Sequence, residues 1–475
     1  MNISQSSFRL FLSKSGNSVL YFAGLTYFAR QLTPEQLGAF FLLMTLRGIF
    51  SIPADLGIGG ALEKRMSEGL DPERTLGSAL AFKIGTITLV SIGVLLAREP
   101  INEYMGADLA VLLVATIISR EFGMFYIRVV RGELRAGETA VIEFVRRLVW
   151  IGTGVALAAA GFGARGLAVG VTIGSAAGFV LGYVKSDTAI GRPSLDLTRS
   201  LVAFSKYETI NSVGGRVYQW MDVAIIGFLL TQQAVSAYEL AWQVTLLVLL
   251  VSKSIEKAVF PQFSQWNANS ETDRIEGALS KSIGVALFVS IPALVGASVY
   301  ASEILGYIFG PEYTFAAGVL VVLMVEKLFQ SFNDIVGGSI KGLDRPDLAA
   351  KATVIALGVN VILSPLFAIR FGLIGVAVGT AIAWFVGTVF RARYLSRFVS
   401  IGIPYRLLGW YTVSSLLMGG SLVVLQALFP VTSILLLVAE VGFGAVVYLG
   451  LSTVVPEVRN EIVMPGVEML RSQAR

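Results

Sequence analysis

The sequence predicts an all-α membrane protein with about fourteen transmembrane helices. The 475 residues are 55% hydrophobic and only 15% charged, and their mean hydropathy is +0.73. A soluble domain has roughly 25% charged residues, so this chain has too few to cover a water-facing surface. Apolar stretches of about 20 residues, the length that crosses a bilayer as a helix, recur along the whole sequence.

The expected helices are separated by short polar loops. We place them at 8–30, 36–62, 75–97, 107–130, 139–161, 166–185, 201–229, 234–260, 278–300, 313–340, 349–370, 373–392, 406–429 and 432–453. No loop is long enough to fold as a catalytic domain, which needs roughly 40 residues. The first stretch lacks the small-residue cleavage site of a signal peptide, so we expect it to be retained.

Basic residues divide the loops into two classes. If the N-terminus is cytoplasmic, the outer loops contain only four of them, Arg30, Arg98, Arg165 and Arg370. The inner loops and the chain ends contain many more, which is the positive-inside distribution. We therefore expect a multi-pass protein of the cytoplasmic membrane with both termini in the cytoplasm. The net charge of +5 is explained by this distribution, so no nucleic-acid partner is expected.

The first twelve expected helices contain an internal repeat. The segment 163–170 (Gly-Ala-Arg-Gly-Leu-Ala-Val-Gly) is matched by 372–379 (Gly-Leu-Ile-Gly-Val-Ala-Val-Gly), and Leu-Thr at 32–33 is matched by Leu-Thr at 230–231. An even number of helices per copy gives two six-helix lobes related by a parallel pseudo-twofold axis. A glycine motif that serves only close helix packing could also arise twice. Several matches in the same order favour duplication.

This repeat predicts the organisation of the chain. The expected parts are a first lobe at 1–185, a cytoplasmic linker at 186–200, a second lobe at 201–392, two extra C-terminal helices at 406–453 and a cytoplasmic tail at 454–475.

The sequence contains no cysteine and no histidine. Disulfides, thiolate chemistry, imidazole bases and the usual cysteine and histidine zinc sites are therefore excluded. We expect no cofactor, no metal site and no catalytic residue, and any proton coupling must use carboxylates.

Charged and polar side chains nevertheless occur within the predicted spans, where they usually face a bundle interior or a water-filled cavity. In the span 201–229, Asn211, Gln219 and Asp222 fall on one helical stripe, with Arg216 at its edge. Such a stripe is directed at something other than lipid.

Two structural interpretations compete with a binding site. The charges could pair between helices, for example Arg47 with Asp55 or Asp222, and simply stabilise the bundle. A second group is interpreted as anchors near the inner surface: Arg120, Glu121, Arg146, Arg147, Lys253, Glu256, Lys257 and Lys281.

Three motifs occur together with the expected helices. They are Leu-Thr-Pro-Glu-Gln-Leu-Gly-Ala-Phe at 32–40, Asp-Leu-Gly-Ile-Gly at 55–59 and the repeated glycine motif. In this order, over residues 8–453, the sequence resembles the polysaccharide transporter (oligosaccharide flippase) family of the multidrug/oligosaccharidyl-lipid/polysaccharide exporter superfamily. The resemblance implies a non-enzymatic transporter that moves lipid-linked glycans to the outer leaflet by alternating access, for cell-surface glycan biosynthesis. Its expected partners are the lipid-linked glycan, membrane lipids, a coupling cation (sodium or a proton) and glycan-assembly proteins.

Such a substrate contains a phosphate or pyrophosphate, for which arginine and lysine are suitable ligands. The candidate substrate-binding residues are Arg47, Arg216, Lys14, Lys206, Lys327, Asn211 and Gln219. The candidates for ion coupling are Asp55, Asp222, Glu239, Glu326 and Asp334.

Three other functions stay open at this point. A cation-coupled multidrug exporter of the same superfamily would be favoured if carboxylates rather than arginines dominated the site. A lipid-linked peptidoglycan-precursor flippase differs only in its substrate. A membrane scaffold or enzyme subunit would have no transport activity.

Overall fold

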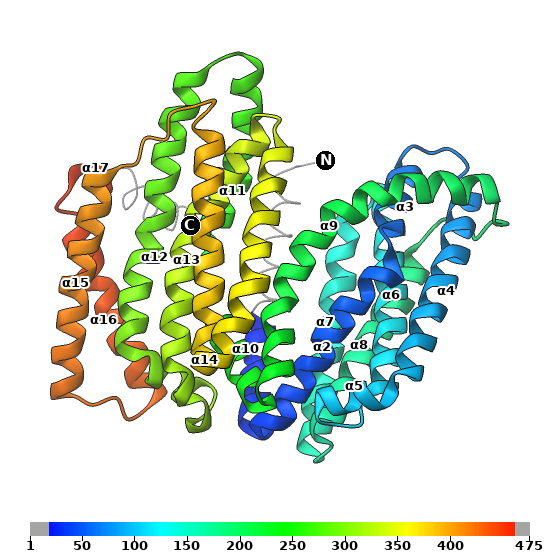
Figure 1. Cartoon of the computed structure of the whole chain (residues 1–475), viewed down its shortest axis with the longest axis horizontal. Helices are drawn as coiled ribbons and strands as arrows, with labels where there is room; N and C mark the ends of the chain where they lie inside the picture. The colour runs from blue at the N-terminus through cyan, green and yellow to red at the C-terminus, as the bar shows by residue number, and fades with distance from the viewer. Residues whose placement is uncertain (1–18, 461–475) are drawn as a thin grey trace, which may run out of the picture. The chain divides into compact units, whose positions relative to one another are not determined.

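The computed structural model describes residues 19–460, with the side chains of 206–219 excepted, and in that range it contains helices and no strand (Figure 1). The all-α membrane fold expected from composition is confirmed. Nine described helices are long and apolar enough to cross a bilayer, and a pair bent by 53° adds a tenth. The count of fourteen stays a prediction. Two compact units divide the chain, Met1–Ala237 and Tyr238–Arg475, and each is described by itself.

The first unit begins, in its described part, with helical residues 19–31. The elements that follow are α2 (Pro34–Asp55), α3 (Ile58–Ser67), α4 (Pro72–Leu96), α5 (Arg98–Met105), α6 (Ala110–Gly132), η1 (Ala136–Glu138), α7 (Thr139–Ala159), α8 (Gly163–Lys185), α9 (Leu195–Leu229) and the start of α10 (Gln232–Thr245).

Helix α2 begins and ends at residues that the sequence motifs contain. Thr33 is its N-cap: the Thr33 hydroxyl accepts a hydrogen bond from the Gln36 backbone N–H at 3.3 Å, and the Gln36 side chain accepts one from the Thr33 N–H at 3.4 Å. This capping box satisfies two N–H groups that have no partner within the helix. The helix ends after Asp55 because Leu56 and Gly57 have φ angles of 44° and 74°, in the left-handed region.

Glycines bring α7 and α8 close together. A Cβ on Gly170 would lie 2.9 Å from the Gly154 nitrogen, and one on Gly174 would lie 2.6 Å from the Arg146 carbonyl oxygen. Only glycine leaves room for this approach, as in other membrane helix pairs with small residues four apart. The close approach places Arg146 directly against α8.

The second unit contains the end of α10 and then α11 (Leu249–Ala268), α12 (Thr272–Ile308), η2 (Pro311–Ala316), α13 (Ala317–Gly342), α14 (Pro346–Leu395), α15 (Tyr405–Leu428), α16 (Ile434–Ser452) and α17 (Pro456–Val458). Helix α13 packs against α11, α12 and α14, and α15 packs against α12 and α16 (Figure 1). Helix α14 is broken at Gly372, where φ is 61°, so it combines the spans expected at 349–370 and 373–392.

Polar contacts join the extra helices α15 and α16 to α12, and the one to α15 is from the Tyr300 hydroxyl to the Leu422 carbonyl oxygen, at 3.4 Å. The Tyr300 hydroxyl donates to the Glu440 carboxylate at 2.5 Å, and both side chains are buried. The Tyr448 hydroxyl donates to the Phe288 carbonyl oxygen at 2.8 Å. Polar groups in an apolar helix bundle are costly unless paired, so these bonds fix how the three helices pack.

The two copies of the glycine motif have the same local structure. Gly163 and Gly372, the first residue of each copy, both have positive φ, 55° and 61°. Four residues before the end of each motif, a glycine packs against the preceding helix without room for a Cβ: Gly166 against Leu157, and Gly375 against the Phe367 carbonyl oxygen. The shared geometry supports the expected duplication, while the pseudo-twofold relation of the lobes stays a prediction.

The segment expected as a linker is attached to the first unit. One Glu133 carboxylate oxygen accepts hydrogen bonds from Ser186, Asp187 and Thr188, at 2.8 to 3.0 Å. The Gly191 N–H donates to the Glu73 carbonyl oxygen at 2.9 Å. Helix α9, placed by the sequence in the second lobe, packs against α2, α3 and α4, so the two compact units divide after α9. The division of the chain into lobes at 1–185 and 201–392 stays a prediction.

Candidate functional site

Three arginines gather inside the first unit. Arg47 of α2 is 8% exposed. The charges of Arg120 of α6 and Arg146 of α7 repel it, and the charge of Glu121 of α6 attracts it. Among the described residues, Arg47 makes no hydrogen bond or ion pair, and its buried Nε has no partner. We call Arg47, Arg120 and Arg146 the arginine cluster. Arg47 is buried, and Arg120 and Arg146 are half-buried. A group of cations that repel one another in a poorly solvated place is costly, and it is typical of an anion-binding site.

The position of Arg47 follows from the packing of α2 against α9. Gly48, next to it in the chain, lies against the Trp220 ring, where a Cβ would come within 2.5 Å. Arg47, Ser51 and Asp55 are four residues apart and therefore share one face of α2. That face is directed into the first unit, since Arg47 and Ser51 are buried.

A second charged group lies beside the arginine cluster. The Lys83 ammonium of α4 contacts an Asp55 carboxylate oxygen and a Glu121 carboxylate oxygen, both at 2.6 Å. The other Glu121 oxygen accepts a hydrogen bond from Arg120, also at 2.6 Å. Lys83 and Glu121 are 1% and 2% exposed. We call Asp55, Lys83 and Glu121 the lysine triad; it joins α2, α4 and α6.

The structure corrects one interpretation of the sequence. Arg120, Glu121 and Arg146 were expected to be anchors near the inner surface, but Arg120 and Arg146 act on the charge of Arg47, and Glu121 is buried in two ion pairs. These contacts give the three residues a part in one charged group, while their depth in the membrane stays a prediction. Arg147 lies over the Tyr21 ring, 5.0 Å from its centre.

The proposed structural pairing of Arg47 with Asp55 is not observed. Asp55 pairs with Lys83, a residue that the sequence reasoning did not consider. A signal for it existed: Lys83 is the only charge between Arg74 and Arg98 in the sequence, and a single lysine in an apolar span needs a partner.

Lys327 and Glu326 lie together in the core of the second unit. Both are fully buried, and the Lys327 ammonium is 2.5 Å from the Glu326 carboxylate. The same ammonium donates to Gln330 at 3.0 Å and lies 3.4 Å from the centre of the Trp242 ring. Lys327 is therefore held by a carboxylate, an amide and an aromatic face.

The other two carboxylates of the second unit that are candidates for ion coupling are bonded to neutral groups. Glu239 accepts a hydrogen bond from the Gln243 amide at 2.6 Å. Asp334 accepts one from the buried Ser252 hydroxyl at 2.8 Å, and charges of both signs lie around it. Among the side chains that the structure describes, no group of three or more acidic residues is arranged to hold a metal ion.

The remaining candidates belong mainly to parts that are not described. Asp222 of α9 is 6% exposed and therefore lies in the interior of the first unit. Outside the described residues or side chains are Lys14, Lys206, Asn211, Arg216 and Gln219.

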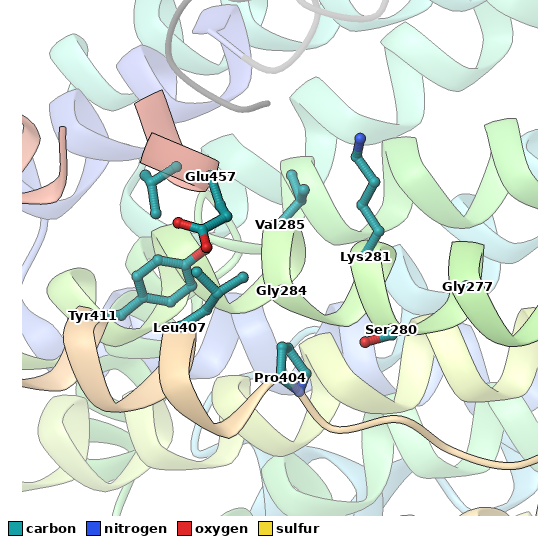
Figure 2. Close-up of a pocket in the computed structure, with 10 residues that line it drawn as sticks. Gly277, Ser280, Lys281, Gly284, Val285, Pro404, Leu407, Tyr411 and Glu457 are labelled. Atoms are coloured by element: carbon teal, nitrogen blue, oxygen red, sulfur yellow. The ribbon is translucent and has the colours of Figure 1, made fainter. Parts of the chain in front are cut away.

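A cavity of about 350 Å³ lies in the second unit between α12, α15 and α17 (Figure 2). Its wall includes Lys281 and Gly284 of α12, Pro404 and Tyr411 at the start of α15, and Glu457 of α17. Figure 2 shows the Lys281 side chain extending away from the Tyr411 ring. The cavity contains none of the predicted substrate-binding residues.

Comparisons with known proteins identify relatives over nearly the whole chain. A family model described as "Polysaccharide biosynthesis protein" matches residues 27–317. The probable low-salt glycan biosynthesis flippase Agl15 of Haloferax volcanii is 42% identical over 460 residues, which cover 97% of this chain and 98% of that protein. The probable flippase AglR of the same organism is 27% identical over 428 residues, 89% of each chain.

One solved structure has a similar fold over the same length. The lipid II flippase MurJ, in an inward closed conformation, superposes with a TM-score of 0.81 and covers 95% of this chain and 99% of its own. The sequences are 16% identical, so this likeness concerns the fold alone.

Proposed function

Since this chain belongs to the polysaccharide biosynthesis protein family, within the multidrug/oligosaccharidyl-lipid/polysaccharide exporter superfamily, we propose that it is a flippase for lipid-linked glycans. It moves the glycan across the cytoplasmic membrane by alternating access. It acts as a transporter without covalent catalysis, and both of its termini are cytoplasmic. The two flippases of Haloferax volcanii support this assignment because they match the chain nearly end to end.

The arginine cluster carries the proposal, because it suits the phosphate of such a substrate. A planar guanidinium can donate two parallel hydrogen bonds to a phosphate, and such charge-assisted bonds are stronger than neutral ones. Arg47 has all of its donors available, and Arg120 has one neighbouring carboxylate. A phosphate bound here would relieve the repulsion between the arginines. Arg216, Lys14 and Lys206 complete the proposed set of cations.

The second unit supplies the polar contacts for the rest of the proposed cycle. Glu239 and Asp334 are the stronger candidates for ion coupling, since each is bonded to a neutral group that a proton or sodium ion can displace. Asp55 and Glu326 already pair with lysine, so a cation would have to compete for them. Asp222 stays a proposed coupling residue and Asn211 and Gln219 stay proposed glycan contacts of the first unit. Lys327 stays a proposed substrate contact of the second unit.

A cation-coupled multidrug exporter would need a different balance of charge in the first unit. A cationic drug needs carboxylates that are not already neutralised. In the described part of the first unit, Asp55 and Glu121 share one lysine, and three arginines lie beside them. This excess of positive charge favours an anionic substrate.

Transport by the reconstituted protein tests the proposal. A fluorescent lipid-linked oligosaccharide is placed in vesicles, and its appearance in the outer leaflet is followed by quenching. The variant Arg47→Ala/Arg216→Ala should abolish transport while the protein still inserts and remains monodisperse. Lys351→Met is the matched control, because Lys351 is an exposed lysine of α14. Wild-type transport by the double variant would refute the phosphate clamp, and a wild-type protein that flips no glycolipid would refute the function.

A further inference from the structure

Lys83 occupies a position that phosphate binding alone does not explain. It lies near the middle of α4 and is 1% exposed, so no phosphate can reach its ammonium without rearrangement. Both of its contacts are carboxylates, Asp55 of α2 and Glu121 of α6, at 2.6 Å. A buried lysine with two carboxylates leaves one negative charge uncompensated within the group. Arg120 supplies that compensation from the arginine cluster.

The contacts of α4 also fix the end of α2. Asp55 is the last residue of α2, and the chain turns at Leu56 and Gly57, which both have positive φ. The Thr86 hydroxyl, one turn beyond Lys83, donates to the Ala54 carbonyl oxygen at 2.8 Å. The last carbonyl groups of a helix have no partner within it, so this bond closes the helix end. Helix α4 thus fixes the face of α2 that contains Arg47.

The charge on Lys83 decides whether Arg120 is available to a ligand. Glu121 is shared between Lys83 and Arg120. When an anion takes Arg120, Glu121 keeps the lysine as its partner, so a buried carboxylate is not left unpaired. Without Lys83, Asp55 and Glu121 would compete with the phosphate for the arginine cluster, and like charges would lie close together in a poorly screened interior.

We propose that Lys83 is a positioning residue that binds Asp55 and Glu121, weakens their competition for the arginine cluster and so keeps that cluster available for phosphate. This inference rests on the proposed function, because it assigns Lys83 a part in the same anion site. A role through charge predicts a different result from a purely structural role. If only the charge balance matters, removing all three charges of the lysine triad should leave phosphate binding intact.

Binding of inorganic pyrophosphate to the purified full chain, measured by titration calorimetry, tests the inference. Lys83→Met should weaken binding at least about tenfold, since two carboxylates then oppose the anion. The isosteric variant Asp55→Asn/Lys83→Met/Glu121→Gln should bind as tightly as the wild type or more tightly. Lys83→Arg keeps the charge and should retain most of the affinity. Lys351→Met is the control for loss of a lysine elsewhere.

Three outcomes would contradict the inference in different ways. Unchanged binding by Lys83→Met means that Lys83 does not affect the site. Weak binding by the triple variant, with a melting temperature equal to that of the wild type, means that the triad acts through structure and not through charge. No pyrophosphate binding by the wild type refutes the anion site itself, and with it the phosphate clamp of the proposed function.

Discussion

Replacing Arg47 by methionine should separate ligand binding from stability. Methionine keeps much of the length and apolar stem of the arginine and removes its charge. Loss of a hydrogen bond to a charged group costs about 1.5–3 kcal/mol, so the dissociation constant for pyrophosphate should rise roughly 10- to 150-fold. The transport rate at low substrate concentration should fall by a similar factor. Both are measured on the same preparation, by calorimetry and by flipping in vesicles.

The stability of the same variant should not fall, and this is the stricter part of the prediction. Arg47 is buried and makes no ion pair with a described residue, and the charges that act on it are two repelling arginines, Arg120 and Arg146, and one attracting carboxylate, Glu121. Its charge therefore contributes net repulsion when no anion is bound. At an effective dielectric constant of about 20, two like charges roughly 8 Å apart repel by about 2 kcal/mol. The melting temperature of Arg47→Met without ligand should therefore equal or exceed that of the wild type.

Lys83→Met is the control for the measurement of stability. Breaking a buried ion pair by removing one partner costs about 3–5 kcal/mol, so Lys83→Met should lower the melting temperature where Arg47→Met does not. The reasoning would be refuted if Arg47→Met melted well below the wild type and bound pyrophosphate equally well. Arg47 would then be a structural residue.

Three further predictions concern packing and pH. Tyr300→Phe removes the hydrogen bond to buried Glu440, so we expect the free energy of unfolding, measured by denaturant titration, to fall by about 1–3 kcal/mol. An unchanged midpoint would show that this bond does not stabilise the packing of the extra helices. Gly174→Ala places a Cβ 2.6 Å from the Arg146 carbonyl oxygen of α7, so it should lower the free energy of unfolding by about 1–3 kcal/mol and slow transport. Gly152→Ala is the control: it has open space around it and should change neither quantity. Hydrogen bonds from Arg135 and Lys185 lower the pKa of loop residue Glu138 from 4.5 to about 2. The stability that the charge of Glu138 contributes is therefore fully present above pH 4.5 and is lost as the pH falls towards 2. The difference in melting temperature between the wild type and Glu138→Gln should shrink across that window, and a difference that grew on acidification would contradict the assigned ion pairs.

Local signals predicted where most helices lie, because each signal depends on residues adjacent in the chain. Two expected spans are each divided in the structure: 36–62 into α2 and α3, and 234–260 into α10 and α11. Thr33 and Gln36 form a capping box that any structure containing this helix start would use. The glycines at 57 and 372 mark breaks in helices because only a residue without a Cβ adopts positive φ at little cost. The sequence predicted two spans, 349–370 and 373–392, on either side of Gly372. In the structure both spans belong to α14, which is broken at that glycine.

The candidate site was predicted only in part, because its contacts join helices far apart in the sequence. Arg47 was identified from its position in a span, and it does lie beside other charges. Its neighbours were not identified: Arg120 and Arg146 were assigned to the membrane surface, and Lys83 was not considered. Which carboxylate pairs with which cation depends on how α2, α4 and α6 are rotated about their axes, and hydropathy contains no such information.

The sequence by itself determined that this chain is an all-helical membrane protein and that it belongs among glycan flippases. These properties follow from composition, apolar length and short motifs, which are local. Only the tertiary structure decided that Lys83 takes the two carboxylates and that Arg47 stays without a partner among the described residues. The physical reason is that a charge buried in a bundle is paired or left unpaired by helix packing, and packing is set by all the side chains of several helices together.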